Sequence, residues 1–326
     1  MNRNLNLERG TLAWFYRLTA LGVLVLIFLG GMVTTRAAGL AVPDWPLSYG
    51  SLNPPGWWNI EPVRLEHSHR LVGMLIGNLV LIAMVWSFIR LRGTSLPWWS
   101  VAGFCAVLAQ GIMGGLRVTE VSTELAIAHG IFGQMVFSLL VCLGFTFGPR
   151  WRPDSLEPKE LHAPKLLPGL LVGVVFVQLI VAATMRHHNA GLAISDFPLN
   201  NGRIIPEFTS WLVAINFTHR LLAFTILCLA IVNAVFIWDG SVADKFLKRA
   251  MGAVLLVITI QICLGVATVW SIRAPVPTTL HVTNGAIVLA TSVVFCLRAL
   301  YLRRLATAPA RLDPVSEPRA NQVPAL

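Results

Sequence analysis

The sequence predicts an all-α polytopic membrane protein, with eight transmembrane helices arranged as two four-helix bundles related by a pseudo-twofold axis. The 326 residues are 56% hydrophobic and 12% charged, and the mean hydropathy is +0.70. A soluble domain carries about 25% charged residues. Apolar stretches long enough to cross a bilayer core of about 30 Å recur along the chain. Four motifs also occur twice, in the same order.

The apolar stretches give the eight helices in order. The first one follows the polar segment "MNRNLNLERGTLAWFYR" and is long enough to span by itself, so we expect a membrane helix and no cleaved signal peptide. The predicted spans are 13–35, 67–89, 97–117, 124–147, 167–186, 211–237, 250–271 and 279–301.

The distribution of Lys and Arg predicts the orientation. An even number of spans puts both termini on one side. If that side is the cytoplasm, 17 of the 25 Lys and Arg residues lie inside and 8 outside, as the positive-inside rule requires. We therefore expect cytoplasmic termini in the cell inner (plasma) membrane. The net charge of +10 then reflects contact with anionic lipid, and we expect no nucleic-acid partner.

The repeated motifs indicate a tandem duplication. Their offset is 150 to 152 residues throughout, and each unit has four spans, so the repeat is parallel. The matching pairs are "GLAVPDWPL" (39–47) with "GLAISDFPL" (191–199), "EHSHRLVGM" (66–74) with "NFTHRLLAF" (216–224), "QGIMGGLRV" (110–118) with "QICLGVATV" (261–269), and "AHGIFG" (128–133) with "LHVTNG" (280–285).

These boundaries divide the chain into parts. The predicted parts are an N-terminal bundle at 1–147, a cytoplasmic linker at 148–166, a C-terminal bundle at 167–304 and a disordered tail at 305–326. The two longest loops, 36–66 and 187–210, are expected to form ordered caps on the outer mouths of the bundles. An interfacial aromatic belt is the alternative.

Four histidines lie at matching places in the two halves, His69 with His219 and His129 with His281. In each half they lie near the outer start of two parallel helices, so the two imidazoles can face each other across the bundle. Such a pair can hold a haem iron from both sides, which makes these four residues candidate iron ligands near the outer face. Zinc is a weaker alternative because three of the four positions lack a supporting carboxylate or thiol. The purely structural alternative is that each histidine makes a hydrogen bond between helices.

Arg70 and Arg220 directly follow two of these histidines, on the side where cations are disfavoured. Arginine suits bidentate binding of carboxylates, and haem carries two propionates. We therefore predict that both arginines bind propionate. Snorkelling to lipid phosphate is the alternative.

Glu66 marks a difference between the halves. It lies three residues before His69 and on the same helix face, whereas the second half has Asn216 at that place. The asymmetry predicts one reacting site and one electron-carrying site. A carboxylate favoured by the helix dipole is the alternative. His67 lies about 200° around the helix from His69 and is interpreted as interfacial; His162, His187 and His188 have no assigned role.

Taken together, the motifs resemble the haem A synthase family over about residues 13–301. The resemblance rests on "GLAVPDWPLSYG", "EHSHRLVG", "AHGIFG", "NFTHRLLA" and "LHVTNG". It implies eight helices in two pseudosymmetric bundles. It also implies oxidation of a ring methyl of haem O to a formyl group, which gives haem A for assembly of the terminal oxidase.

The resemblance also implies roles for individual residues. His69 and His129 would bind the substrate haem iron, Glu66 would be the catalytic carboxylate, and His219 and His281 would bind a haem b cofactor. The expected partners are haem O, membrane lipid, a haem O synthase (farnesyltransferase), oxidase assembly factors and a second copy of the chain. The chain departs from many members at Val42 and Ser48, where cysteines would be expected.

One alternative function comes from another class, a bis-His dihaem cytochrome b-type electron carrier or quinol oxidoreductase. Pure electron transfer does not require the difference between Glu66 and Asn216. A haem transporter is a third possibility, and it gives no reason for that difference either.

Overall fold

A computed structural model describes residues 3–148, 151, 166–200, 202–239 and 244–307. Eight of its helices are long and apolar enough to cross a membrane, which confirms the predicted number of spans. They are α1 (Arg3–Thr35), α2 (Glu61–Arg90), α3 (Leu96–Thr119), α4 (Thr123–Thr146), α5 (Leu167–His187), α6 (Trp211–Trp238), α7 (Lys245–Trp270) and α8 (Pro275–Thr307). The predicted tail from residue 308 onward and most of the predicted linker lie outside the described residues.

Four helices, α1, α2, α7 and α8, extend at least four residues past a predicted end. α1 begins at Arg3 because its polar first turns have an apolar side, on which Leu5 packs against the core and Leu12 is fully buried. α2 begins at Glu61, so Glu66 lies in the second turn of the helix. The helix dipole acts within the first turn. It therefore favours Glu61 and gives no reason for Glu66.

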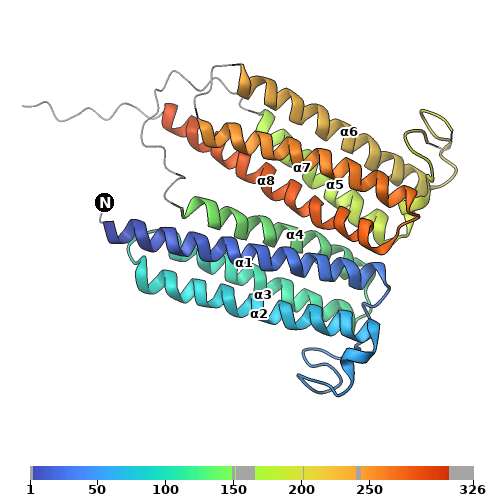
Figure 1. Ribbon diagram of the computed structural model, residues 1–326, viewed down its shortest axis with the longest axis horizontal. Helices are drawn as coiled ribbons and strands as arrows, with labels where there is room; N and C mark the ends of the chain where they lie inside the picture. The colour runs from blue at the N-terminus through green and yellow to red at the C-terminus, as the bar shows by residue number, and fades with distance from the viewer. Residues whose placement is uncertain (1–2, 149–150, 152–165, 201, 240–243, 308–326) are drawn as a thin grey trace, which may run out of the picture.

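The helices form two units of four. The first unit is α1–α4, in which α1 and α3 each pack against α2 and α4; the second is α5–α8, in which α5 and α7 each pack against α6 and α8. In Figure 1 the loops before α2 and α6 lie at one end of the molecule, here called the loop end. The N-terminus and the last turn of α8 lie at the opposite end, the terminal end.

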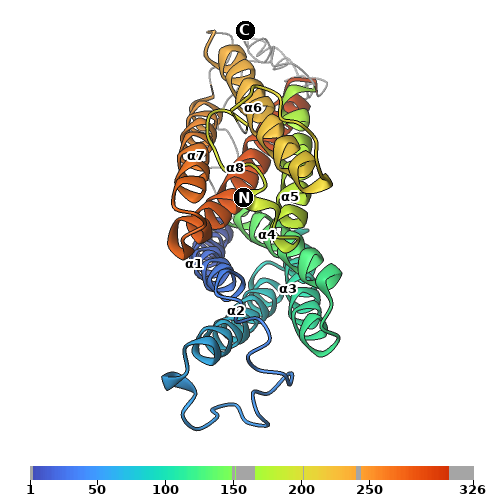
Figure 2. The ribbon, with the colours of Figure 1, turned by 90° about the vertical axis from the view of Figure 1, so that its right-hand side faces the viewer.

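Helix α8 joins the two units. It packs against α1 and α4 of the first unit as well as α5 and α7 of its own, and Figure 2 shows α1 and α4 on the side of the first unit that faces α8. Its Ala286 and Ala290 are buried in the hydrophobic core of the first unit. α1 and α8 approach closely at Gly31, where a Cβ would lie 2.7 Å from the Thr279 methyl. Arg186 at the end of α5 also donates to the Gly31 carbonyl at 2.8 Å.

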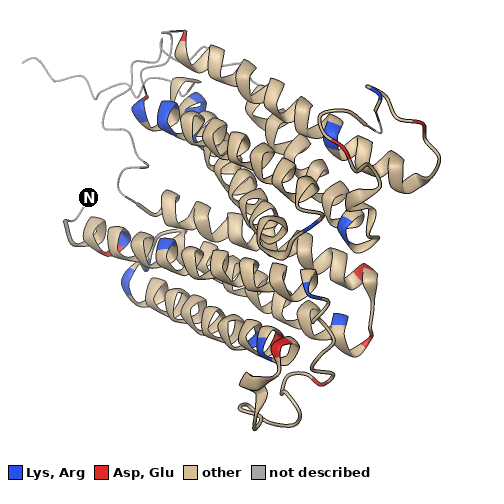
Figure 3. Ribbon diagram, turned by 45° about the vertical axis from the view of Figure 1, so that its right-hand side comes forward, with Lys and Arg blue, Asp and Glu red and all other residues tan. Residues whose placement is uncertain are grey.

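Charged residues gather toward the two ends of the helices, as Figure 3 shows. The helix interiors between them are apolar, as a membrane core requires. One ion pair at the terminal end is buried. It joins Arg298 on α8 to Asp244, whose carboxylate caps α7 by accepting from the Leu247 N–H. The arginine also donates to the carbonyl of Trp151, and its side chain is 2% exposed.

Replacing Arg298 by Met is expected to lower the free energy of unfolding by about 3 kcal/mol, because it leaves the Asp244 carboxylate buried without its cation. Denaturant titration of the protein in detergent measures this change. The control is Lys245→Met, at the exposed first residue of α7 next to Asp244, for which a loss of about 0.5 kcal/mol or less is expected. Equal losses in the two variants would contradict a special role for the pair.

Candidate functional site

The second pair of predicted ligands faces one another in the structure. His219 of α6 and His281 of α8 have ring centres 6.2 Å apart, with ring planes at 63°. Two metal–nitrogen bonds of about 2 Å, plus about 1 Å from each nitrogen to its ring centre, give roughly 6 Å. The separation therefore suits two imidazoles that share one metal ion.

The first pair also lies together. His69 of α2 and His129 of α4 are close enough for the charge of one to act on the other. Both pairs lie toward the loop end of their helices. Among the described residues no three His, Cys, Asp or Glu side chains converge. The two histidine pairs are therefore the candidate metal-binding groups of the described chain.

Glycines on the neighbouring helices lie directly against three of the four rings, and each is called here the seat of its histidine. A Cβ at Gly30 of α1 would lie 2.9 Å from Cε1 of His69, and one at Gly114 of α3 would lie 2.8 Å from Cε1 of His129. At Gly265 of α7 the distance to Cε1 of His281 would be 3.1 Å. A side chain at these positions would push the ring away, so glycine fixes where each imidazole lies.

The ring nitrogens are suited to binding a ligand. Nδ1 is buried without a hydrogen-bond partner in His69, His129 and His219. In His281 it lies 3.1 Å from the Gln261 carbonyl, which can only accept, so Nδ1 carries the hydrogen. Nε2 then has a lone pair, and the side-chain amide nitrogen of Gln261 lies 3.3 Å from it. Metal-ligating histidines commonly have this arrangement. A buried imidazole nitrogen without a partner is costly, so the pairs fit a bound haem iron.

Amide side chains hold the backbone beside these histidines. Gln110 donates to the carbonyl of His129, and Gln178 donates to that of His219, each at 2.9 Å. Gln261 lies beside His281 and accepts from Asn284 at 2.8 Å. The sequence reasoning missed these glutamines, although Gln110 and Gln261 open the third repeated motif.

The predicted propionate-binding arginines hold the loops. Arg70 donates to the carbonyls of three loop residues and to Oε1 of Glu66 at 2.7 Å. Arg220 likewise donates to three loop carbonyls, to Asn200 and to Asn216. The acceptors are near because the turns in "VPDWPL" and "ISDFPL" direct their carbonyls at the helix. This gives both arginines a structural task, and their role with propionate stays a prediction.

Glu66 and Asn216 take the same place beside these arginines. Glu66 is 2% exposed; its Oε1 accepts from Arg70 and its Oε2 accepts from the Val42 N–H at 3.0 Å. Asn216 accepts from Arg220 at 3.1 Å and donates to the Ala190 carbonyl at 2.8 Å. Both residues therefore tie a loop to its helix. They differ in charge, since only the first site holds a carboxylate.

His67 is not interfacial, which corrects the prediction made from sequence. It is 2% exposed, its Nδ1 lies 2.9 Å from the Ser48 hydroxyl, and its ring packs against Trp57. The loop before α2 folds over this face of the helix, which hydropathy could not indicate. Val42 and Ser48, where cysteines were expected, thus contact Glu66 and His67 respectively.

The loop before α2 is itself ordered by Asp44. Its carboxylate accepts from the backbone N–H groups of Tyr49 at 2.7 Å and Gly50 at 2.8 Å. Burial raises the pKa of this carboxyl, but the hydrogen bonds from Gly50 and Tyr49 together with nearby Arg70 outweigh it, so the pKa lies below its ordinary value. The carboxylate form that holds the turn therefore persists at neutral pH.

Two further ionisable residues lie within electrostatic range of the first site. The charge of Arg117 on α3 acts on His69, His129 and Glu66. His187, from the end of α5 in the second unit, acts electrostatically on His129 and is affected by Arg117. Neither residue was assigned a role from sequence. The signal for Arg117 was present in the repeat, where "GGLRV" aligns with "GVATV".

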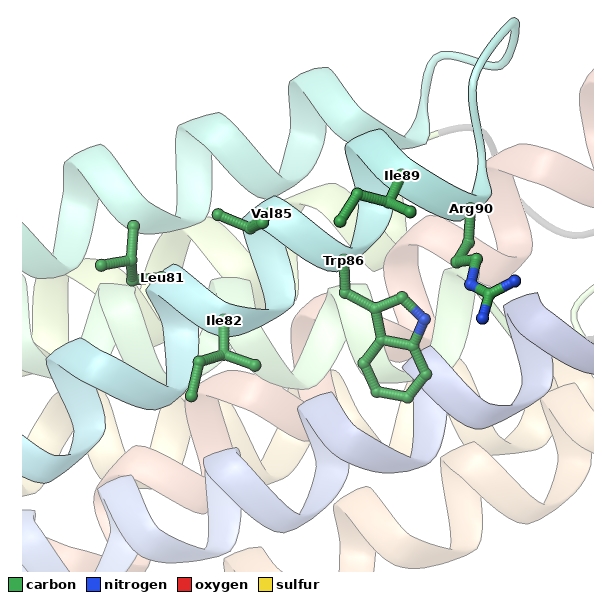
Figure 4. Close-up of a pocket in the computed structure, with 6 residues that line it drawn as sticks. All are labelled: Leu81, Ile82, Val85, Trp86, Ile89 and Arg90. Atoms are coloured by element: carbon green, nitrogen blue, oxygen red, sulfur yellow. The ribbon is translucent and has the colours of Figure 1, made fainter.

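A surface hollow lies elsewhere, on the half of α2 toward the terminal end. Figure 4 shows the side chains that line it, which are Leu81, Ile82, Val85, Trp86, Ile89 and Arg90. They come from one helix and are almost entirely apolar. The hollow offers no group for catalysis or metal binding, so the histidine pairs remain the candidate sites.

Comparison with known proteins matches residues 61–293 to the COX15-CtaA family model, described as a cytochrome oxidase assembly protein. The chain is 28% identical to a protein named Heme A synthase from Shouchella clausii, over 88% of this chain and 95% of that protein. It is 27% identical to a Heme A synthase from Alkalihalophilus pseudofirmus, over 79% and 86% of the two chains. A third, from Beijerinckia indica, is 28% identical over 80% of this chain and 86% of its own.

Proposed function

The chain belongs to the COX15-CtaA family of cytochrome oxidase assembly proteins, and from this premise we propose that it is a haem A synthase. In this proposal it is a membrane oxidoreductase that converts a methyl group of haem O to the formyl group of haem A. The observation that carries the proposal is the separation of 6.2 Å between the ring centres of His219 and His281, which suits a shared iron. The paired histidines at the same end of the first unit, His69 and His129, would bind the iron of the substrate haem.

The proposed roles follow from this arrangement. His69 and His129 bind the iron of haem O, and their glycine seats set the position of the porphyrin. His219 and His281 bind haem b, which when bound would supply a redox centre for one-electron transfer. Glu66 acts at the first site, where its fixed negative charge stabilises positive charge that develops beside the reacting methyl group or accepts a proton from it.

Arg70 and Arg220 have a narrower part in this scheme than the sequence suggested. Four of the five N–H groups of Arg70 can be assigned to its hydrogen bonds with the loop and Glu66. A propionate would meet each arginine only through donors that the loop leaves unused. The main contribution of both arginines is then to hold the loops over the sites.

The wider setting is proposed as well. The two units are tandem copies related by a pseudo-twofold axis. The hydrogen bond of Arg70 to Glu66 in the first unit matches that of Arg220 to Asn216 in the second, which supports this. The termini lie in the cytoplasm of a cell with the protein in its inner membrane, so the loop end and both haem sites lie near the outer face. A haem O synthase would supply the substrate, and oxidase assembly factors or a second copy of the chain are candidate partners.

Chromatography of the haems extracted from the purified protein tests the proposal. Haem B together with haem O or haem A is expected. Haem B alone would favour the dihaem electron carrier and contradict the synthase.

Replacing Gly114 by Ala is expected to weaken haem binding at the first site about tenfold, because the new Cβ would lie 2.8 Å from Cε1 of His129 and displace the ring. Absorbance titration with haem O measures the affinity. Gly111→Ala, one turn away on the same helix, is the matched control because nothing lies within 4 Å of its added Cβ. A loss of the same size in the control would rule out the seat as the cause.

A further inference from the structure

The two sites differ in a second charged residue besides Glu66. Arg117 lies on α3 one turn beyond Gly114, which seats His129, so the arginine is on the same helix face and nearer the loop end. Its charge acts on both histidines of the first site and on Glu66. The guanidinium therefore stands beside the place proposed for the substrate.

The donors of Arg117 are mostly unused. Among the described residues it makes one hydrogen bond, from Nη2 to the Gly39 carbonyl at 3.2 Å, and no ion pair within 4 Å. Arg70, by contrast, has four acceptors around its guanidinium. A partly buried cation with spare donors is costly unless an anion compensates it. The loop is already held by the hydrogen bonds of Arg70, so the single hydrogen bond of Arg117 to the loop does not explain why a cation lies at this position.

The second site has no cation at the matching place. Thr268 lies one turn beyond Gly265, which seats His281, and its hydroxyl donates to the Leu264 carbonyl of its own helix at 2.8 Å. The cation whose charge acts on His281 is instead Arg186 of α5, and its Nη2 donates to the Gly31 carbonyl and the Thr35 hydroxyl. A cation on the helix that also carries the glycine beside the histidine is therefore found at the first site and not at the second.

We propose that Arg117 is the carboxylate-binding residue for a propionate of the first-site haem. This inference rests on the proposed function, because haem O supplies the propionate. Arginine binds carboxylates through two parallel N–H groups, and Arg117 has the donors for it.

The test compares haem O with its propionate dimethyl ester, which cannot form the ion pair. Both are titrated into the purified protein with its second site filled, and the Soret absorbance gives each affinity. The wild type is expected to bind haem O about tenfold to a hundredfold more tightly than the ester. Arg117→Gln is expected to bind the ester as the wild type does and to bind haem O no more tightly than the ester. Unchanged discrimination in Arg117→Gln would overturn the inference.

Three controls separate the possible causes. Arg64→Gln removes a loop-end cation that contacts Trp58, and it should keep the discrimination. An unchanged second-site haem spectrum in Arg117→Gln shows that the variant is folded. His129→Ala should abolish the added binding. If the wild type takes up no haem that depends on His129, the proposed function itself is overturned, which differs from a loss of discrimination alone.

Discussion

Replacing Glu66 by Gln is expected to slow the conversion of haem O by about a hundredfold or more while both haem sites stay filled. Glutamine has the same shape and keeps one oxygen as an acceptor, but its amide nitrogen cannot accept, so one of the two hydrogen bonds of Glu66, from Arg70 or from the Val42 N–H, is lost with the charge. Arg70 still donates to three loop carbonyls, so the loop is expected to stay in place. Without the carboxylate, the nearby positive charges of Arg70 and Arg117 oppose any positive charge that develops on the substrate.

Haem extraction after turnover, followed by chromatography, measures this effect as the ratio of haem A to haem O. The matched control is Asn216→Gln, which alters the corresponding loop contact in the second unit without a change of charge. It is expected to leave conversion within a few-fold of the wild type. Normal haem A output from Glu66→Gln would refute a chemical role for the carboxylate and leave it only as a loop contact.

Replacing His219 by Ala is expected to remove the haem of the second site and to stop conversion at the first. The remaining His281 gives the iron one protein ligand in place of two, and the ring that lay 6.2 Å away is gone. The bis-His absorption spectrum should lose the contribution of this site, and haem content per chain should fall by about half. Conversion should drop at least tenfold because the proposed electron exchange has no second centre.

His188→Ala serves as the comparison for this variant. His188 also lies at the loop end of the second unit, where its ring packs against Trp211, but it is exposed and is not a proposed ligand. It should retain both haems and full conversion. A His219→Ala variant with an unchanged spectrum would show that the second pair is not the binding site.

The sequence was informative where the relevant signal is local. Apolar length gave the eight helices, and the repeated motifs gave His69, His129, His219 and His281. The contacts of Arg70 depend on how a distant loop turns its carbonyls, which no spacing in the sequence records. For the same reason the buried position of His67 could not be predicted.

Two other features were not predicted from the sequence, namely the start of α1 and the position of Arg117 near the first site. The first turns of α1 contain charges, so apolar length excluded them, although Leu5 and Leu12 pack against the core on one side. Arg117 aligns with Thr268 in the repeat, so it differs between the two copies in charge just as Glu66 differs from Asn216.

The position of α8 has a consequence for biogenesis. This helix comes after the other seven in the chain, yet Ala286 and Ala290 complete the core of the first unit, and Thr279 packs on Gly31 of α1. During synthesis the first four helices enter the membrane with that side still facing lipid. The core of the first unit is therefore complete only when the last helix has been inserted, so the packing of the first unit depends on synthesis of the whole second unit.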